Sequence, residues 1–200
     1  MLNFKNTLLT TLLLTCGAAL AAPETYTIDS SHTYPSFKAA HIGGISFWRG
    51  KIDKNSGAVV LDRAAKTGSI EIVMDMTSID FGHEKMNEHA KKDEIFDVAK
   101  FPTATYKSTK LIFSGDTLTG VDGNLTLHGV TKPVHLTVNQ FKCIPHPFYK
   151  REVCGADASA AIDRTDFGVS YGVGKAIPDG KVTLEIQVEA LKDEAAGPAG

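Results

Sequence analysis

The stretch GNLTLHGVTKPVHLTV, residues 123–138, alternates apolar and polar positions twice, with a break between the two runs. Leu125 and Leu127 alternate with polar neighbours in the first run, and VHLTV repeats the pattern in the second. A period of two places successive side chains on opposite faces of a strand. The pattern therefore predicts two strands joined by a turn, each with one apolar face that something must cover.

Runs of the same kind recur roughly every eight to fifteen residues along the chain, a spacing typical of short strands separated by turns. The ten runs are 24–29, 36–41, 46–52, 57–62, 68–76, 104–113, 116–127, 134–141, 156–163 and 181–191. Turn residues at 55–57, 114–116, 122–123 and 178–180 predict breaks between strands. Many short strands indicate an all-β antiparallel sandwich or barrel, because no helices alternate with them.

Nearly every predicted strand has one apolar face, as in SIEIVMDM (69–76) and VTLEIQV (182–188). Two sheets facing each other, or one sheet closed on itself, would bury these faces inward. Closure would also remove unpaired strand edges. The alternation alone leaves both architectures open.

One segment, residues 82–103, breaks the strand pattern. It is rich in helix formers and in charges of both signs, and Pro102 ends it. A solvated surface excursion is a common explanation for such a charge run. The apolar cluster Ile95, Phe96, Val98 and Phe101 favours instead a short helix that acts as a lid over the end of a barrel.

The first 22 residues read as a cleaved secretory signal, because Lys5 precedes an apolar run that ends in Ala19–Leu20–Ala21. Lipidation at Cys16 is the alternative, although Thr15 is a poor residue before the modified cysteine. No other apolar stretch approaches the roughly 20 residues of a spanning helix, so stable membrane insertion is not expected. The predicted organisation is a signal at 1–22, one domain at 23–192 and a flexible tail at 193–200.

The formal net charge of −2 is spread over interspersed acidic and basic residues. A nucleic-acid-binding surface would need a basic stripe, so nucleic acid is not an expected partner. Two cysteines remain after the signal, Cys143 and Cys154, and an even number in an exported chain predicts a disulfide. A metal site or redox pair is a weaker interpretation, because no Cys-x-x-Cys occurs and only His146 lies between them.

The sequence gives little sign of catalytic or metal chemistry. The seven histidines are scattered. His83 and His89 are six apart, on different faces of the predicted helix, and His128 and His135 lie on separate predicted strands with no carboxylate or cysteine at a typical ligand spacing. A Gly-x-Ser-x-Gly nucleophile motif is absent, as is a glycine-rich loop before a helix. Asp163, Arg164 and Asp166 invite an acid–base interpretation, but pairing between Arg164 and an aspartate at a turn is the simpler prediction.

Four stretches in order resemble the YceI-like family of exported bacterial proteins. They are IDSSHTYPSFKAAHIGGISFWRGKI, MNEHAKKDEIFDVAKFPTATYKST, GNLTLHGVTKPVHLTV and IDRTDFGV, and together they span the predicted mature chain. The sequence departs from the family pattern at Asn87, where an aspartate is expected, and at Ala90, where a larger apolar residue is expected. The Cys143–Cys154 pair is an addition to that pattern.

The resemblance implies a lipocalin-like, eight-stranded antiparallel β-barrel whose lumen holds a long isoprenoid lipid, a polyprenol or an isoprenoid quinone, in the periplasm. No cofactor besides this bound lipid and no catalysis are expected, and a homodimer is suggested by the resemblance alone. His32 and His41 are the expected contacts of a quinone head group. The expected contacts of the lipid tail are Phe37, Trp48, Ile52, Met74, Met76, Phe81, Met86, Phe96, Phe101, Tyr106, Phe113 and Phe167.

Small residues at expected inward positions favour a hollow barrel. They are Ala39, Gly50, Ala58 and the run at 156–161. An eight-stranded barrel can equally be filled by its own side chains, which would leave its surface loops to carry the function. A third hypothesis is an enzyme that modifies a lipid or quinone with groups at the barrel mouth.

Overall fold

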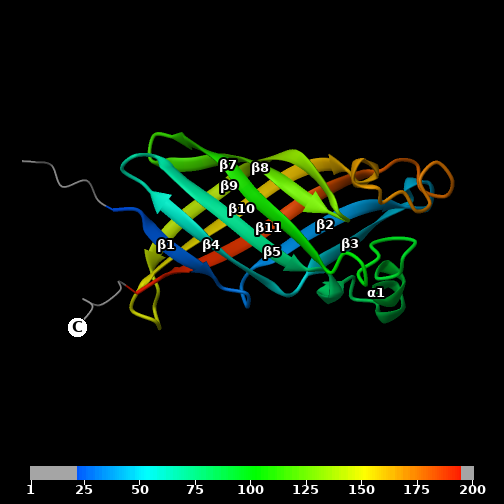
Figure 1. The fold of residues 1–200 in the computed structure, drawn as a ribbon, viewed down its shortest axis with the longest axis horizontal. Helices are drawn as coiled ribbons and strands as arrows, with labels where there is room; N and C mark the ends of the chain where they lie inside the picture. The colour runs from blue at the N-terminus through cyan, green and yellow to red at the C-terminus, as the bar shows by residue number, and fades with distance from the viewer. Residues whose placement is uncertain (1–21, 195–200) are drawn as a thin grey trace, which may run out of the picture.

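The structure, a computed structural model, describes residues 22–194, so the predicted signal and most of the predicted tail lie outside it. It contains one α-helix, three short 3-10 helices and eleven strands within that range (Figure 1). The strands are β1 Glu24–Ile28, β2 Tyr34–His41, β3 Ser46–Ile52, β4 Asn55–Asp62, β5 Thr67–Asp75, β6 Ile79–Asp80, β7 Thr103–Ser114, β8 Thr117–Leu127, β9 Val130–Pro145, β10 Glu152–Asp163 and β11 Lys181–Lys192. The helices are η1 Ile42–Gly44, η2 Met76–Ser78, α1 Glu84–Ala90 and η3 Arg164–Phe167.

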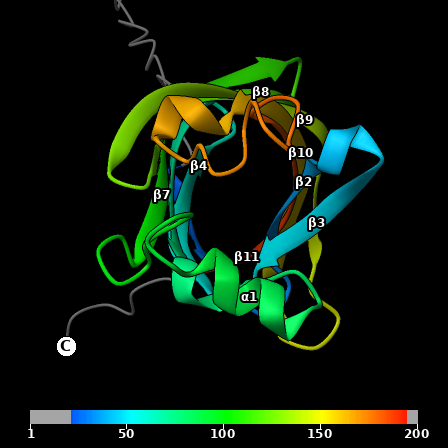
Figure 2. The same cartoon turned by 90° about the vertical axis from the view of Figure 1, so that its right-hand side faces the viewer.

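Eight strands close into an antiparallel barrel. The hydrogen-bonded ring runs β1–β4–β5–β7–β8–β9–β10–β11, and pairing between β1 and β11 closes it. Viewed along its axis, the barrel is a ring with α1 and the chain after η3 lying across one end (Figure 2). The prediction of an eight-stranded antiparallel barrel with a helical insertion is therefore confirmed, and closure explains where the apolar strand faces go.

At three neighbouring places in the barrel wall, one strand ends partway along the barrel and another strand takes its place. The C-terminal part of β11, residues 190–192, pairs with β1, whereas residues 182–187 pair with β2. The chain passes from β3 to β4 through two residues, and from β5 to β6 through η2. The base half of this wall is thus β1, β4 and β5, and the mouth half is β2, β3 and β6.

Two buried polar residues sit at these strand changes and satisfy backbone groups that the ladders leave free. The side-chain nitrogen of Asn55, Nδ2, donates to the carbonyl oxygens of Thr33, at 2.9 Å, and Ile52, at 2.8 Å. The Thr33 hydroxyl donates to the Glu189 carbonyl oxygen at 3.1 Å. Buried backbone groups are costly when unpaired, so Thr33 and Asn55 stabilise the interruption in the wall.

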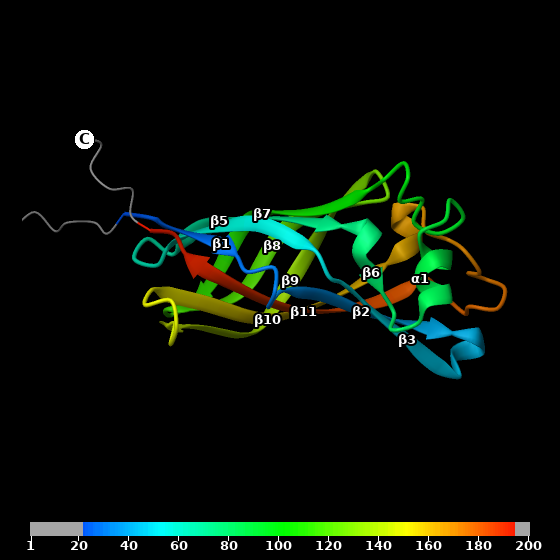
Figure 3. The ribbon, with the colours of Figure 1, turned by 90° about the horizontal axis from the view of Figure 1, so that it is seen from below.

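Helix α1 lies at the mouth end of the barrel, beyond β6 (Figure 3). Asn87 ties it to that strand: its side-chain oxygen accepts from the Phe81 backbone amide, and its side-chain nitrogen donates to Asp80. Ala90, the last residue of α1, is fully buried, and Ile95 in the segment that follows is 8% exposed. The predicted lid is therefore present, and Asn87, where the sequence departs from the family pattern, anchors it.

Two of the predicted turns are wrong. Asn55–Gly57 begins β4, and the Glu71 carbonyl oxygen lies so close that a Cβ on Gly57 would be 2.0 Å from it. Asp122–Gly123 lies inside β8, beside a register shift, where Gly123 makes room for the Tyr106 ring. Both glycines mark a close approach within a sheet instead of a chain reversal.

The base end of the barrel holds the first and last described strand ends, β1 and β11, and the β9–β10 hairpin (Figure 1). Cys143 and Cys154 face each other on β9 and β10 and form the predicted disulfide, with a Cα–Cα distance of 4.0 Å. None of the helices within residues 22–194 is long and apolar enough to cross a membrane.

Candidate functional site

A long apolar cavity of about 1080 Å³ runs through the barrel. It extends from Tyr26 and Ala190 near the base to Ile42 and Tyr171 at the mouth. Small-molecule sites typically occupy about 300–1,000 Å³, so this lumen is slightly larger than that range. The alternative of a barrel filled by its own side chains is therefore wrong.

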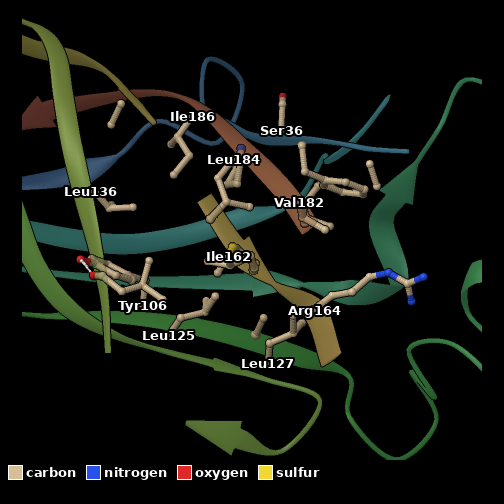
Figure 4. A pocket seen from close by; sticks show the side chains of 18 of the residues that line it. Ser36, Tyr106, Leu125, Leu127, Leu136, Ile162, Arg164, Val182, Leu184 and Ile186 are labelled. Atoms are coloured by element: carbon tan, nitrogen blue, oxygen red, sulfur yellow. Dashed lines mark hydrogen bonds between the residues drawn. The ribbon is translucent and has the colours of Figure 1, made fainter. Parts of the chain in front are cut away.

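The alternating strand faces provide most of the lumen wall. Every second residue of β11 from Val182 to Ala190 lines the cavity, as do Ile70, Ile72 and Met74 of β5. The apolar positions of the stretch at 123–138 line it too, from β8 and β9 (Figure 4). The period-two pattern therefore identifies the inner face of the barrel.

Most of the predicted tail contacts lie on the lumen wall or the lid above it, and their contact with a lipid stays a prediction. The lining residues are Phe37, Trp48, Ile52, Met74, Met76, Phe81, Met86, Phe96 and Tyr106. Tyr106 is the most polar of the barrel-wall members. Its hydroxyl lies 3.0 Å from the Val134 carbonyl oxygen, and burial raises its pKa, so it stays neutral.

Three predicted contacts do not line the lumen. Phe101 leaves the lid and packs against His128 in the β8–β9 turn, with ring centroids 4.5 Å apart. Phe113 lies near the end of β7 and packs against the core cluster without lining the cavity. Phe167 is 2% exposed within η3. All three are core or turn residues, which an aromatic residue alone does not distinguish from a ligand contact.

Small side chains widen the lumen at several of the predicted positions. Ala39, Ala156 and Ala158 line the cavity. Gly50 lies directly behind the Phe37 ring, since a Cβ there would be 2.6 Å from Phe37 Cζ. Ala58 was predicted to point inward, but it is its neighbour Val59 that lines the cavity. Ala58 is on the same face of β4 as Val60, opposite to the face on which Val59 and Leu61 line the cavity.

The base of the lumen is closed by a tyrosine held in a network of charged groups. The Tyr26 side chain is fully buried, and its hydroxyl donates to Glu24 or Glu152. Arg63 bridges the same two carboxylates, at 2.6 and 2.9 Å. Hydrogen bonds from Lys192, Arg63 and Tyr26 lower the pKa of Glu24 to about 2. Burial, followed by the hydrogen bond to Glu152, raises the pKa of Tyr26.

The mouth of the lumen carries two imidazole rings. His41 lies at the end of β2 with its ring edge-on to Trp48, the centroids 5.4 Å apart. His89 on α1 contacts Tyr171 in the same way, at 5.1 Å, and lies 3.1 Å from Glu94. Both rings line the cavity. His89 was missed because a histidine in a charged helix gives no sign of facing a lumen.

His32 does not line the lumen, which corrects its assignment as a head-group contact. It lies in the exposed β1–β2 turn, where Nδ1 is 2.8 Å from Asp29 and 3.1 Å from the Ser31 hydroxyl. The hydrogen bond with Asp29 raises the pKa of His32. Because Ser31 and Asp29 approach the same ring nitrogen, the ring is not placed between a carboxylate and a nucleophile as in a hydrolase triad.

The segment that follows η3 was missed as part of the site. Residues 169–173 and 175–177 line the mouth. Arg164, labelled in Figure 4, lines it as well. Arg164 donates to the carbonyl oxygens of Val169 and Tyr171, each at 2.7 Å. Burial lowers the pKa of Arg164. The predicted Arg–Asp pairing is wrong, since Asp163 instead caps η3 by accepting from Thr165.

The charged side chains that line the cavity are basic. Arg164 and Lys175 line the cavity, and within residues 22–194 no aspartate or glutamate does so. The one group of potential metal ligands in that range is Cys143, Cys154 and Glu152. Both cysteine sulfurs are consumed by the disulfide, so this group does not offer the thiolates that a soft metal requires.

Comparison with known proteins gives consistent matches over most of the chain. A family model described as YceI-like domain matches residues 26–190. The protein named Protein YceI from Salmonella arizonae is 31% identical over 193 residues, which cover 96% of this chain and 98% of that protein.

Solved structures share the fold at lower identity. Burkholderia cenocepacia BcnA superposes with a TM-score of 0.65 at 23% identity, covering 82% of this chain and 99% of that one. A polyisoprenoid binding domain from Saccharophagus degradans, implicated in plant cell wall breakdown, gives a TM-score of 0.62 at 18% identity, covering 84% and 98%. At these identities the two structures establish the fold alone.

Proposed function

The chain belongs to the YceI-like family, and from this membership and the shape of the lumen we propose that it binds a long isoprenoid lipid inside the barrel and carries it in the periplasm. The observation that carries the proposal is the continuous apolar cavity from Tyr26 to the mouth. The Saccharophagus degradans structure, described as a polyisoprenoid binding domain, supports the class of ligand. The predicted secretory signal and the disulfide suit an oxidising compartment such as the periplasm.

An isoprenoid chain matches the chemistry of this lumen. Transfer of each methylene from water to an apolar site is worth about 0.8 kcal/mol, so a five-carbon unit contributes roughly 4 kcal/mol. Three or four buried units would reach nanomolar affinity after the usual losses of association. Such a tail needs no hydrogen bond along its length, and the walls supplied by β5, β9 and β11 are apolar.

Thr33, Ser36 and Tyr106 line the wall, but the charged and imidazole side chains lie at the two ends of the cavity, which would set the direction of the ligand. The base end is closed by Tyr26 and its charged partners. The mouth presents His41, His89 and Arg164. An amphiphile would therefore place its tail toward Tyr26 and its head group at the mouth, where a quinone carbonyl or a hydroxyl finds hydrogen-bond donors.

We favour binding over catalysis. An enzyme acting on the head group would need a nucleophile or an acid–base pair aimed into the mouth. Of the mouth histidines, His89 has a nearby carboxylate, Glu94, but Glu94 does not line the cavity. Conversion of the bound lipid on incubation would establish the enzyme instead.

Mass spectrometry of organic extracts from the purified protein tests the proposal. Protein prepared from a host that makes isoprenoid lipids is expected to release one such lipid in near-stoichiometric amount. Repeatedly lipid-free extracts, together with no binding of added polyprenol or quinone, would refute it. Cell fractionation with an antibody to the protein tests the periplasmic location.

A further inference from the structure

Large apolar side chains are exposed in two groups within the described residues. Ile42, Ile45, Phe47 and Tyr171 form the first group, here called the mouth tip. Ile144, Phe148 and Tyr149 form the second, on the β9–β10 hairpin at the opposite end of the barrel (Figure 3). Contiguous exposed apolar residues commonly mark a site that contacts a partner or a membrane.

The mouth tip is continuous with the lumen, which the second group is not. Ile42 is 56% exposed and Tyr171 is 48% exposed, yet both also line the cavity. The backbone amide of Gly43 donates to the Ala176 carbonyl oxygen at 2.7 Å, so the β2–β3 tip and the loop after η3 form one rim. Apolar side chains therefore lead from the outer surface into the barrel, beside the polar groups His41, His89 and Arg164 of the mouth.

The tip projects from the molecule. Gly43 and Gly44 have φ values of +63° and +77°, a conformation that glycine adopts without strain. A Cβ on either would meet no atom within 4 Å. Ile45, which follows them, is 83% exposed. The tip is thus a narrow wedge with large apolar side chains at its end.

The charged residues of β2 and β3, the two strands that form the tip, are all basic. The segment 36–52 contains Lys38, Arg49 and Lys51 and no carboxylate. Lys38 and Lys51 form ion pairs with acidic residues. Arg49 on β3 and Lys175 on the adjoining loop take part in none of the ion pairs found within residues 22–194. Lipid surfaces rich in anionic head groups attract such cations.

We propose that the mouth tip docks on an anionic lipid bilayer, with Ile45 and Phe47 inserted between the head groups and the acyl chains. Interfacial elements that combine apolar and basic residues bind membranes in this way. Docking would place the mouth against the bilayer, so that a lipid moves into the lumen without crossing water. This inference rests on the proposed function only for the identity of the lipid that enters the lumen. Docking on the bilayer itself requires no ligand.

Flotation with vesicles of phosphatidylcholine and phosphatidylglycerol tests the docking. The double variant Ile45→Glu/Phe47→Glu is expected to bind these vesicles at least tenfold more weakly than the unmodified protein. The matched control is Phe148→Glu/Tyr149→Glu, which places the same charges on the equally exposed apolar group at the other end. The control is expected to bind vesicles as the unmodified protein does.

Thermal unfolding of both variants shows that the fold is retained, because all four side chains are exposed. Equal loss of binding in both variants, or absence of binding by the unmodified protein, would overturn the proposal. A dimer that Ile45→Glu/Phe47→Glu converts to a monomer would also overturn it, since the tip would then cover a second copy.

Affinity for polyprenol in detergent separates this inference from the proposed function. Both variants are expected to retain that affinity while only the mouth variant takes up polyprenol from vesicles at least tenfold more slowly. An equal uptake rate in the two variants would overturn the docking role. Failure of every form to bind polyprenol would refute the lipid proposal while leaving the flotation result to decide docking.

Discussion

Arg164 donates a hydrogen bond from Nη2 to the carbonyl oxygen of Tyr171, over 2.7 Å, and so holds the rim of the mouth in place. Its other terminal nitrogen, Nη1, donates to the carbonyl oxygen of Val169. Replacing Arg164 with alanine leaves both carbonyl oxygens without this donor and is expected to lower the free energy of unfolding by about 2 kcal/mol. Amide hydrogen exchange should accelerate at least tenfold in residues 170–177, and bound lipid should dissociate faster.

Arg151→Ala is the matched control, because this arginine donates to the Lys192 carbonyl oxygen at the base end. It should leave exchange in 170–177 unchanged. If Arg164→Ala leaves that exchange unchanged as well, the rim does not depend on the guanidinium.

Ala158 offers a direct way to shorten the lumen. It is 5% exposed and lines the cavity from β10. In Ala158→Phe, the added ring would occupy space that a lipid tail needs, and each displaced isoprene unit forfeits roughly 4 kcal/mol of burial. Affinity for a polyprenol should fall at least tenfold, measured by the fluorescence of Trp48, the single tryptophan. Ser159→Phe is the control, because it adds the same ring at the next residue of the strand and should leave the affinity unchanged. Unaltered affinity in Ala158→Phe would argue against a lipid tail in the lumen.

His41 separates the two lipid classes. Its ring lies at the mouth. A quinone would present two carbonyl acceptors there, whereas a polyprenol would present a single terminal hydroxyl and a hydrocarbon tail that makes no comparable hydrogen bond. His41→Ala is expected to weaken quinone binding about fivefold, the effect of one hydrogen bond of about 1 kcal/mol, and polyprenol binding much less. His32→Ala should change neither, because His32 faces solvent. Calorimetric titration with both ligands measures the difference, and equal losses for the two ligands would contradict a head-group role.

The disulfide stabilises the base end of the barrel. It links residues 11 apart in sequence, and closing so short a loop is worth about 3 kcal/mol in the chain-entropy model. Cys143→Ala/Cys154→Ala should therefore lower the free energy of unfolding by about that amount in a urea titration. Reducing agent should destabilise the unmodified protein to the same extent and leave the variant unaffected. A reductant effect on the variant would point to another cause.

Because of Glu24, we expect the free energy of unfolding to depend on pH in the acidic range. Its pKa falls from 4.5 to about 2 on folding, chiefly through the hydrogen bond from Lys192. A carboxylate whose pKa is lower in the folded state contributes stability above the unfolded value, and this stability is lost as pH falls from about 4.5 toward 2. The side chain is 28% exposed, so solvent screening leaves on the order of 1 kcal/mol.

Glu24→Gln should therefore be less stable than the unmodified protein at neutral pH, and the difference should vanish as pH approaches 2. Urea titrations across that range measure the difference. Glu71→Gln removes the exposed ion pair with Lys107 and should follow the unmodified protein at every pH. A constant difference for Glu24→Gln would show that its carboxylate does not titrate in this window.

The features that could be predicted from the sequence depend on the local alternation of apolar and polar residues or on residue types that lie close together in the sequence. Alternation in β5, β9 and β11 identifies the lumen wall because neighbouring side chains on a strand must point to opposite faces. The disulfide was predictable from two cysteines that follow a predicted secretory signal, and the lid from a cluster of apolar residues in a polar segment.

The features that could not be predicted depend on which strand lies beside which. Gly57 and Gly123 look like turn residues until Glu71 and Tyr106 are found packed against them. The loop after η3 has no alternation to place Tyr171 at the mouth. Phe167 is buried in η3 without reaching the lumen, and its residue type gives no hint of that difference.

The sharing of one β11 edge between β1 and β2 divides the barrel into two parts with different mechanical roles. Around the base, the ladder of eight strands is uninterrupted and leaves no seam. On the mouth side, β6 is two residues long and ends the row of strands, with α1 and not another strand beyond it. If a lipid enters by the mouth as proposed, we expect any widening for a bulky head group at the entrance, because the hydrogen-bonded ring of strands is closed at the far end.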